Sequence, residues 1–548
     1  MNLSQLGLST MNAARARLIT AGHNINNAGT PGYSRQSVIV STAGATASGQ
    51  GFFGRGVQVD TVRRAYNNFL ANQFVSAQSK GAMLASFGNQ VSQVNNLIAD
   101  NTVGISPAIQ KFFDGVQAVA STPGDPAARQ ELLGRTQALV GQFNEMNTFL
   151  NNQRNDVNGQ VQTIVTQINS HVQRVAELNK QIEIAKGSTG QVPNDLLDQR
   201  DQEVADLNML AKVNVLEQNG QYTLTIGNGQ LLVSGSDTFP LTCGPSDSDP
   251  RNMAVYVNVP AGKGFAKVEL DETSIKGGSL GGLITFRKNS LDEVQRQLGQ
   301  LATGMALAIN EVQAQGVDLN GQAGTPIFKI GQPDVVANAR NAGSGTLTAS
   351  INLDGASQLR ASDYDIRFDG TNYQVTRQPD GEQVYFGTTL NNAQIDGMTV
   401  TLGGAPSAGD SWKLMPSRDT AGQLEMMISS PDKFAAASPA GGSANGENML
   451  AIAALQTSKT LGGGNMSFNE AYSQMVNKVA VHTQQNGAEA KAQAALIEQT
   501  YSAHQAVSGV NLDEEYVNLD RFQEQYVAAS KLIEVSATLF DVLMGIRA

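Results

Sequence analysis

Residues 512–543 read LDEEYVNLDRFQEQYVAASKLIEVSATLFDVL and carry the pattern that organises the rest of the chain. From Leu519 onward, apolar and small residues recur at alternating steps of three and four: Leu519, Phe522, Tyr526, Ala529, Ile533, Ser536, Phe540 and Leu543. A repeat of 3.5 residues keeps one narrow stripe of a helix against a partner helix, so the pattern predicts a coiled coil. The same rhythm occurs near the other end of the chain, at Met11, Ala14, Leu18, Ala21 and Ile25. We therefore expect the two terminal helices to be partners.

The composition favours long helices over a compact enzyme core. The chain has 548 residues, enough for three or four domains of ordinary size. Hydrophobic residues make up 41%, but aromatic residues only 6% and charged residues 16%. We predict a mainly α, elongated multidomain protein with inserted β structure, in which terminal coiled-coil helices flank a long helical bundle body.

Charge and cysteine content argue against several classes of protein. The net charge is −11 and no stretch of Lys and Arg occurs, so the basic surface of a nucleic-acid-binding protein is missing. The single cysteine, Cys243, cannot form an internal disulfide. Residues 1–18 do not resemble a Sec-type signal peptide, and no stretch approaches the ~20 apolar residues that span a bilayer. We expect no nucleic-acid or membrane partner.

A turn motif follows the first helix. Residues 2–28 are expected to be helical and to end before Pro31. Asparagine side chains can hydrogen-bond the free carbonyls of the helix end, and Pro-Gly enforces a turn. The predicted exit-turn residues are Asn24, Asn27, Pro31, Gly32 and Tyr33. Residues 34–65 alternate in polarity and contain glycines, which indicates extended chain.

Between the two ends, helical and β segments alternate. The pattern predicts helices at 66–118 (broken at Pro107), 127–186, 196–210, 289–315 and 420–510 (broken at 439–446 and 462–464). The helix at 127–186 would be about 85 Å long. Strands are predicted within 213–280, where 222–226 and 230–233 form a hairpin, and within 345–415. The domains that we expect are 1–65 with 505–548, 66–335 with 420–504, and an outer β domain at 336–419.

The residues that could carry chemistry do not form a recognisable constellation. The four histidines are scattered, and Cys243 has no histidine near it in sequence. Asp195, Asp198 and Asp201 would share one helix face and could bind a cation, but acids that favour a helix N-terminus, with Arg200 nearby, are the simpler interpretation. The glycine-rich residues 277–282 lack the Lys-Ser/Thr of a phosphate loop. We expect no catalytic, cofactor or metal site, and no enzyme.

Both ends of the chain resemble a known superfamily. Residues 21–36, AGHNINNAGTPGYSRQ, are similar to the N-terminal signature shared by rod, hook and hook-associated proteins of the bacterial flagellum. Residues 508–516, SGVNLDEEY, are similar to their C-terminal signature. Residues 196–201, LLDQRD, and 278–282, GSLGG, narrow the resemblance to a protein of the junction between hook and filament.

The resemblance implies a structural role. Such proteins leave the cell through the flagellar type III export system and pair their terminal helices into an inner tube on assembly. The assembly seam would consist of Leu3, Leu18, Ile25, Leu519, Phe522, Tyr526, Ile533, Phe540 and Leu543. Expected partners are the hook protein, a second junction protein, copies of the same chain in a helical layer and an export chaperone on the C-terminal helix. The expected function is a mechanical adaptor, located outside the cell at the hook–filament junction.

Other interpretations remain open at this point. A hook or rod subunit would share the terminal signatures but usually lacks the long helix at 127–186. A secreted adhesin could bind through the β domain at 345–415. A secreted peptidoglycan-cutting enzyme would need a pair of acidic residues in a cleft, which the sequence does not mark.

Overall fold

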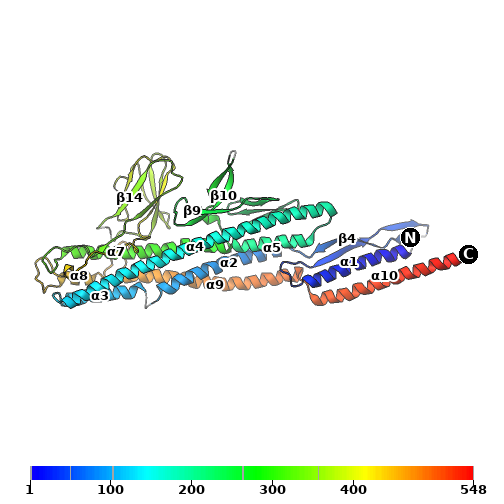
Figure 1. Cartoon of the computed structure of the whole chain (residues 1–548), viewed down its shortest axis with the longest axis horizontal. Coiled ribbons are helices and arrows are strands. Elements are labelled where there is room, and N and C mark those ends of the chain that lie inside the picture. The colour runs from blue at the N-terminus through cyan, green and yellow to red at the C-terminus, as the bar shows by residue number, and fades with distance from the viewer. Residues whose placement is uncertain are drawn as a thin grey trace.

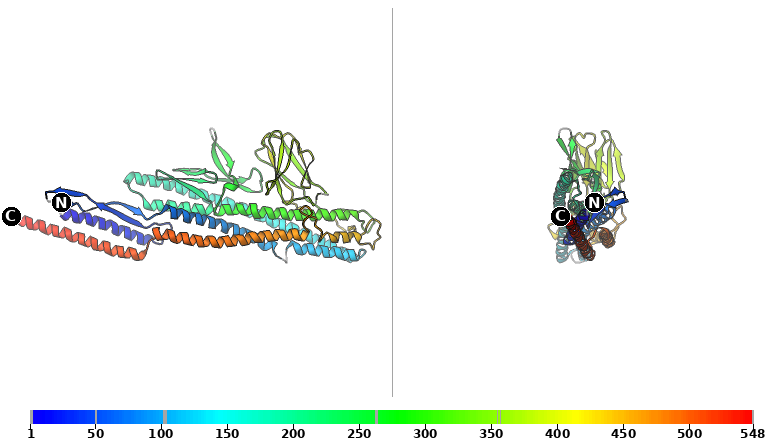
Figure 2. Two further views of the ribbon diagram at one scale, coloured as in Figure 1. Left: turned by 180° about the vertical axis from the view of Figure 1, so that it is seen from behind. Right: turned by 90° about the vertical axis from the view of Figure 1, so that its right-hand side faces the viewer.

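The protein is elongated, with helices along its length and β structure on one side (Figures 1 and 2). The computed structural model describes residues 3–49, 51–100, 104–261, 264–353, 355 and 357–546. Helix α1 begins and helix α10 ends at the same end of the molecule (Figure 1). The outer β sandwich stands on the side of the rod, far from both termini (Figure 1).

A terminal section consists of two helices and a β ribbon. Helices α1 (Leu3–Asn27) and α10 (Leu512–Ile546) pack side by side in opposite directions. Strands β1 (Gln36–Thr42) and β4 (Val57–Arg64) form an antiparallel ribbon along α1. The ribbon is extended by a hairpin of two shorter strands, β2 (Ala45–Ser48) and β3 (Gly51–Gly54).

Long helices form the body. Its helices are α2 (Asn68–Ile98), α3 (Ile105–Ser121), α4 (Pro126–Thr189), α5 (Asn194–Leu210), α6 (Gly278–Phe286), α7 (Asp292–Gln315), α8 (Glu447–Ala454) and α9 (Phe468–Ser508). A π-helical turn, Arg287–Leu291, joins α6 to α7. Helix α2 packs on α9 and α6, and α4 packs on α3 and α5. These contacts bury one continuous apolar core that extends from Phe87 to Val479 in sequence.

Helix α4 shows how local signals set an unusual length. The Asp125 carboxylate accepts a hydrogen bond from the Ala127 N–H at 3.0 Å, and Pro126 occupies the first turn, where its missing N–H costs nothing. Gly190, with φ of 67°, ends the helix in the left-handed conformation. Between them lie 64 residues, or roughly 95 Å of helix. Apolar side chains recur on one face along most of this length and are buried.

Two β pieces cover one side of the body. The first contains a sheet of β5 (Val213–Gln218), β6 (Gln221–Ile226), β7 (Gln230–Ser234) and β8 (Asp237–Thr238), and a sheet of β9 (Thr242–Pro245), β10 (Met253–Ala261) and β11 (Gly264–Glu269). The predicted hairpin is the antiparallel pair β6 and β7. Short 3₁₀ turns occur at Glu272–Ser274 and Pro431–Lys433, and β12 (Phe328–Lys329) pairs with β21 (Glu425–Met426).

The second piece is an outer sandwich with its own core. One sheet has the order β13-β20-β15-β16-β17 and the other β14-β19-β18. The strands are β13 (Asp334–Ala337), β14 (Thr346–Ile351), β15 (Asp363–Phe368), β16 (Tyr373–Gln378), β17 (Gln383–Gly387), β18 (Ala393–Ile395), β19 (Met398–Gly403) and β20 (Ser411–Met415). Tyr364, Val375 and Trp412 are buried between the sheets.

Buried ion pairs fasten this sandwich to the body. The Arg418 guanidinium lies 2.5 Å from Asp363 of the sandwich, 2.9 Å from Asp249 and 3.2 Å from Asp292 of α7. Arg154 of α4 contacts Asp292 at 2.5 Å. Burial by itself raises the pKa of Asp249 and Asp292, but the neighbouring guanidinium groups outweigh it and hold both pKa values below the usual range.

Two expectations about elements are corrected by the structure. Residues 420–438 were expected to be helical, but they form β21, a 3₁₀ turn and irregular chain, which Gly422 and Pro431 favour over helix. Arg129 of α4 satisfies part of this irregular backbone by donating to the carbonyls of Pro431 and Phe434. Residues 278–280 belong to α6 and not to the β segment. The predicted break at Pro107 is present: α2 ends at Ile98 and α3 begins at Ile105, with Pro107 in its first turn.

Candidate assembly site

Small residues bring α1 and α10 close together. Ala13, Ala14 and Ala21 of α1 are buried, and so is Ala529 of α10. A Cβ atom added at Gly7 would lie 2.7 Å from Cγ1 of Ile533 and 3.0 Å from the carbonyl oxygen of Ala529. The helices therefore approach with almost no space between their backbones at this point.

The predicted seam is only partly covered by this pairing. Five of its residues are half-buried: Leu18, Ile25, Leu519, Phe522 and Ile533. Four remain exposed: Leu3, Tyr526, Phe540 and Leu543. Arg17 of α1 lies over the Phe522 ring, 5.5 Å from its centroid, and donates to Gln525 at 3.2 Å. Pairing within one chain thus covers the seam only partly, and the distal residues Phe540 and Leu543 are the most exposed.

Helix α10 exposes many large apolar side chains, most of them from Tyr526 onward. Its exposed large hydrophobic residues are Leu512, Tyr516, Val517, Tyr526, Val527, Leu532, Val535, Leu539, Phe540, Val542, Leu543, Met544 and Ile546. Phe540 is 59% exposed and Leu543 65% exposed. An apolar surface of this extent on one helix marks a site of interaction with another protein or an assembly partner.

Asn24 is the centre of the exit turn. Its side-chain N–H groups donate to the Gln36 carbonyl at 2.9 Å and to the Glu515 carboxylate at 3.1 Å. Its side-chain oxygen accepts from the Gln36 N–H at 2.9 Å and from the Tyr33 hydroxyl at 2.7 Å. Burial, together with the nearby Asp195, Asp198 and Glu515, raises the pKa of Tyr33 well above its ordinary value. The phenol therefore keeps its proton and remains a donor.

The other predicted turn residues have more local roles. Asn27 caps the end of α1 by donating to the His23 carbonyl at 3.0 Å, and it accepts from the Thr30 hydroxyl at 3.2 Å. Gly32 adopts φ of 77°, and a Cβ there would lie 2.7 Å from Oε1 of Gln202. Pro31 is exposed at the turn. Position 32 therefore requires glycine for both conformation and space.

Ion pairs join the start of α10 to Arg35, the residue before strand β1. Arg35 lies 2.8 Å from Glu514 and 2.7 Å from the buried Glu515. The Arg35 backbone N–H donates to the carbonyl of Ser508, the last residue of α9, at 2.8 Å. Asn24 and Arg35 thus hold the same carboxylate from two directions. The sequence motifs alone did not indicate this cluster, because Glu515 is almost 500 residues away from both in the chain.

The acidic row on α5 joins the terminal section to the body. The Asp198 carboxylate accepts from the Ser34 N–H and hydroxyl, both at 2.9 Å, and lies 2.7 Å from Arg64. Asp201 lies 2.6 Å from Arg64 and accepts from the Tyr222 hydroxyl. Burial raises the pKa of Asp198, an effect that Ser34 and Arg64 oppose.

The three aspartates of α5 thus do more than favour the N-terminus of the helix. Only Asp195 lies in the first turn of α5, where it contacts His23 at 3.2 Å. The sequence interpretation was wrong about Asp198 and Asp201, whose partner is Arg64 and not Arg200. Arg200 is fully buried elsewhere, against the Asn179 side chain and the Tyr222 ring.

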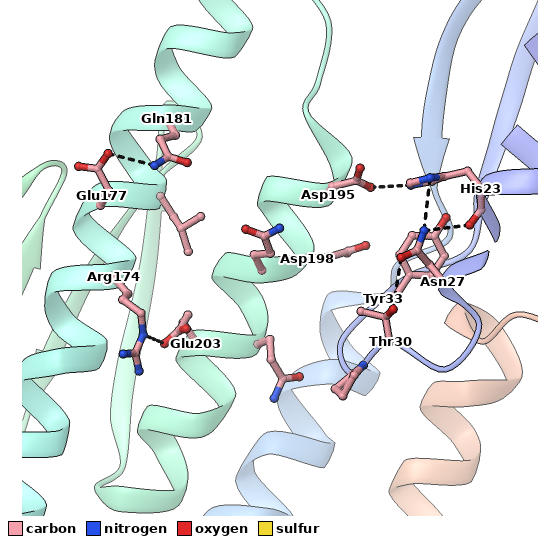
Figure 3. Close-up of a pocket in the computed structure, with 14 residues that line it drawn as sticks. His23, Asn27, Thr30, Tyr33, Arg174, Glu177, Gln181, Asp195, Asp198 and Glu203 are labelled. Atoms are coloured by element: carbon pink, nitrogen blue, oxygen red, sulfur yellow. Dashed lines mark hydrogen bonds and ion pairs between the residues drawn. The ribbon is translucent and has the colours of Figure 1, made fainter. Parts of the chain in front are cut away.

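A cavity of about 580 Å³ separates the exit turn from α4 and α5. Figure 3 shows His23 and Asp195 facing each other across one side of it, with Arg174 and Glu203 on the other. Glu203 contacts Arg174 at 2.7 Å and His171 at 2.6 Å. In the described part of the chain, no three His, Cys, Asp or Glu residues are placed to hold a metal ion together. The described helices include none that is long and apolar enough to span a membrane.

Comparisons with known proteins agree on one family. Residues 91–328 match the family model "Flagellar hook-associated protein FlgK helical domain", and residues 336–416 match "Flagellar hook-associated protein 1, D2-like domain". The chain is 38% identical to flagellar hook-associated protein 1 of Salmonella typhimurium over 98% of this chain and 99% of that protein. It is 37% identical to the protein of the same name from Escherichia coli K12, over 98% of each chain.

A solved structure is also similar. The flagellar hook junction protein FlgK from Burkholderia pseudomallei superposes with a TM-score of 0.75 at 29% sequence identity. The match covers 80% of this chain and 100% of that one.

Proposed function

The chain belongs to the flagellar hook-associated protein 1 family and is a structural protein of the flagellar hook–filament junction, and we propose that it acts there as a mechanical adaptor layer. The observation that carries this proposal is the set of uncovered apolar side chains on α10, which with α1 forms a helix pair that extends from the end of the body. In this proposal, α1 and α10 contact the hook protein on one side of the layer and the second junction protein on the other side.

Several finer parts of the role belong to the same proposal. The nine seam residues complete an inner sleeve only when copies of the chain stack beside one another in a helical layer. Such head-to-tail contacts do not close on themselves and so build a filament layer. The body and sandwich lie outside the sleeve and make fewer contacts, so the layer tolerates the bending of the hook.

The proposal also includes the route by which the chain leaves the cell. The chain leaves the cell unfolded through the flagellar type III system, and a small chaperone covers α10 before export. Exposed apolar stripes such as this one promote aggregation in the cytosol. The chain has no catalytic activity in this role, which is consistent with the structural flagellar proteins that are its relatives.

Complementation of a deletion strain tests the adaptor role. Cells without the protein should carry hooks without filaments and should release filament protein into the medium. The variant Phe540→Asp/Leu543→Asp should fold normally, because both side chains are exposed, yet fail to restore filaments. Electron microscopy and immunoblots of the culture medium provide the readout.

A matched control separates assembly from general damage. Val481→Asp changes an equally exposed apolar residue on α9 of the body and should restore filaments. Normal filaments on cells that lack the protein, or full rescue by the double variant, would contradict the adaptor assignment.

A further inference from the structure

Two phenylalanines project from the hairpin at the end of the terminal section. Phe52 and Phe53 of β3 are 81% and 55% exposed, and Phe52 is the most exposed large apolar side chain in the described part of the chain. Because successive side chains of a strand point to opposite faces, the two rings lie on opposite sides of the hairpin. A two-stranded hairpin with uncovered aromatic rings is poorly stable alone and gains stability from a partner surface.

An apolar groove lies farther along the same terminal section. It has a volume of about 710 Å³ between α1, the β1–β4 ribbon and the connection from α4 to α5. Ile19, Val59 and Val192 line it and are 62%, 40% and 48% exposed. Asp60 also lines this groove, and so does Asp195, which is paired with His23 at 3.2 Å.

The hairpin and the groove of one chain cannot meet. The ribbon near the hairpin packs beside the first turns of α1, because a Cβ at Gly56 would touch Ser9 and Leu6. The groove is bordered by Ile19 and His23 of the same helix. Gly56, at the base of the hairpin, is therefore about 20 Å from the groove along α1. Phe52 lies four residues beyond Gly56 in the hairpin, about 13 Å of extended chain. A contact between them must join different copies and, because the surfaces differ, it can repeat from each copy to the next.

We propose that Phe52 of one copy inserts into this groove of the next copy in the junction layer. The inference rests on the proposed stacking of copies in one layer and names the contact that sets their offset. Charge complementarity supports this occupant: Arg55 is exposed, three residues from Phe52, and Asp60 lies at the groove. The offset between neighbouring copies along the helix axis is then at least about 20 Å.

Disulfide trapping in assembled flagella tests the contact. In a Cys243→Ser background, the chain that carries both Phe52→Cys and Val192→Cys should give a ladder of covalent multimers after mild oxidation. Either cysteine alone should give none, because the donor and acceptor surfaces are different. A benzophenone amino acid at position 52, which keeps an aromatic ring there, should cross-link to another copy at the groove.

The outcomes separate this inference from the proposed function. Cells with normal filaments but no ladder and no cross-link between copies would overturn the contact while leaving the adaptor role intact. A photo-cross-link from position 52 to hook protein or to another junction protein would also overturn it. Failure of the adaptor role itself shows differently, as normal filaments in the deletion strain.

A charge substitution gives an independent measurement. Phe52→Asp should weaken the contact between copies about tenfold or more, so filaments should break off at lower shear. Its matched control is Phe386→Asp on the outer sandwich, where the phenyl ring is 59% exposed. Thermal unfolding of both purified variants should equal that of the unchanged protein. Equal shear resistance of the two variants would contradict the proposal.

Discussion

At the scale of single residues, Asn24 determines how the two ends of the chain meet. All four hydrogen-bonding positions of its side chain are used, and its partners come from the exit turn, β1 and α10. The sequence marked Asn24 as a turn residue. It could not identify Glu515 as a partner, since no periodic pattern links residues 24 and 515.

Replacing Asn24 by alanine tests this role. Asn24→Ala removes one of the two partners of the buried Glu515 carboxylate and the acceptor of the Tyr33 hydroxyl, which we expect to cost roughly 1–3 kcal/mol of stability in the terminal section. Hydrogen exchange of the first turns of α10 should accelerate, while the body is unchanged. Asn26→Ala, at an exposed position of the same helix, is the control and should exchange like the unchanged protein.

The buried carboxylates under the sandwich predict a dependence on pH. Asp249 and Asp292 have pKa values below the ordinary ~3.9 of an unfolded chain, because Arg251, Arg418 and Arg154 outweigh their burial. Their stabilisation is therefore complete above about pH 4 and is lost as the pH falls through the lowered values. The free energy of unfolding of the body should decrease between pH 4 and pH 2.

Two variants check the source of that decrease. Asp292→Asn should lower stability at neutral pH and flatten the dependence below pH 4, because one of the titrating groups is gone. Asp520→Asn, on the exposed surface of α10, should leave the curve unchanged. A curve for Asp292→Asn that is parallel to that of the unchanged protein would contradict the assignment.

At the scale of elements, sequence periodicity located helices well and irregular chain poorly. The helix predicted at 127–186 extends from Pro126 to Thr189, because its apolar period and its caps agree. The prediction for 420–438 was wrong because its apolar residues, such as Phe434, are buried without helical backbone. Its fold depends on Arg129, about 300 residues away. The pairs Arg64–Asp198 and Arg35–Glu515 escaped prediction for the same reason.

The closeness of α1 and α10 predicts opposite effects for one substitution at two glycines. Gly7→Ala places a methyl group against Ile533 and the Ala529 carbonyl, so it should push the helices apart and destabilise the pair. Gly22→Ala meets nothing within 4 Å and should stabilise α1 by about 0.5–1 kcal/mol. Protease cleavage of the terminal section measures both. Slower cleavage of Gly7→Ala than of Gly22→Ala would contradict the packing described.

At the scale of the whole molecule, the sandwich and the body share charged groups that neither can satisfy alone. Arg296 of α7 contacts Asp363 of the sandwich at 3.2 Å, and both are buried. The outer domain is thus joined to the helices by more than its two connecting chains. A buried charge is tolerated only while its partner is present.

Removal of the sandwich should therefore reverse the direction in which one substitution changes stability. In the full chain, Arg296→Met should lower stability by roughly 1–3 kcal/mol, because a buried carboxylate loses a donor. In a chain that lacks residues 336–416, the same change should raise stability, because Arg296 has lost Asp363. Thermal unfolding of the four proteins gives the comparison. The same sign in both backgrounds would show that the shared ion pairs do not couple the domains.

The position of the termini has a practical consequence for labelling. Because α1 begins and α10 ends at the same end of the molecule, an epitope or fluorescent tag fused at either terminus is delivered to the same crowded place. The turn at Asp380 and Gly381 lies on the distant sandwich, is exposed, and has open space around Gly381. A short tag inserted at that turn reports the position of the protein on a living cell and stays away from the paired helices α1 and α10.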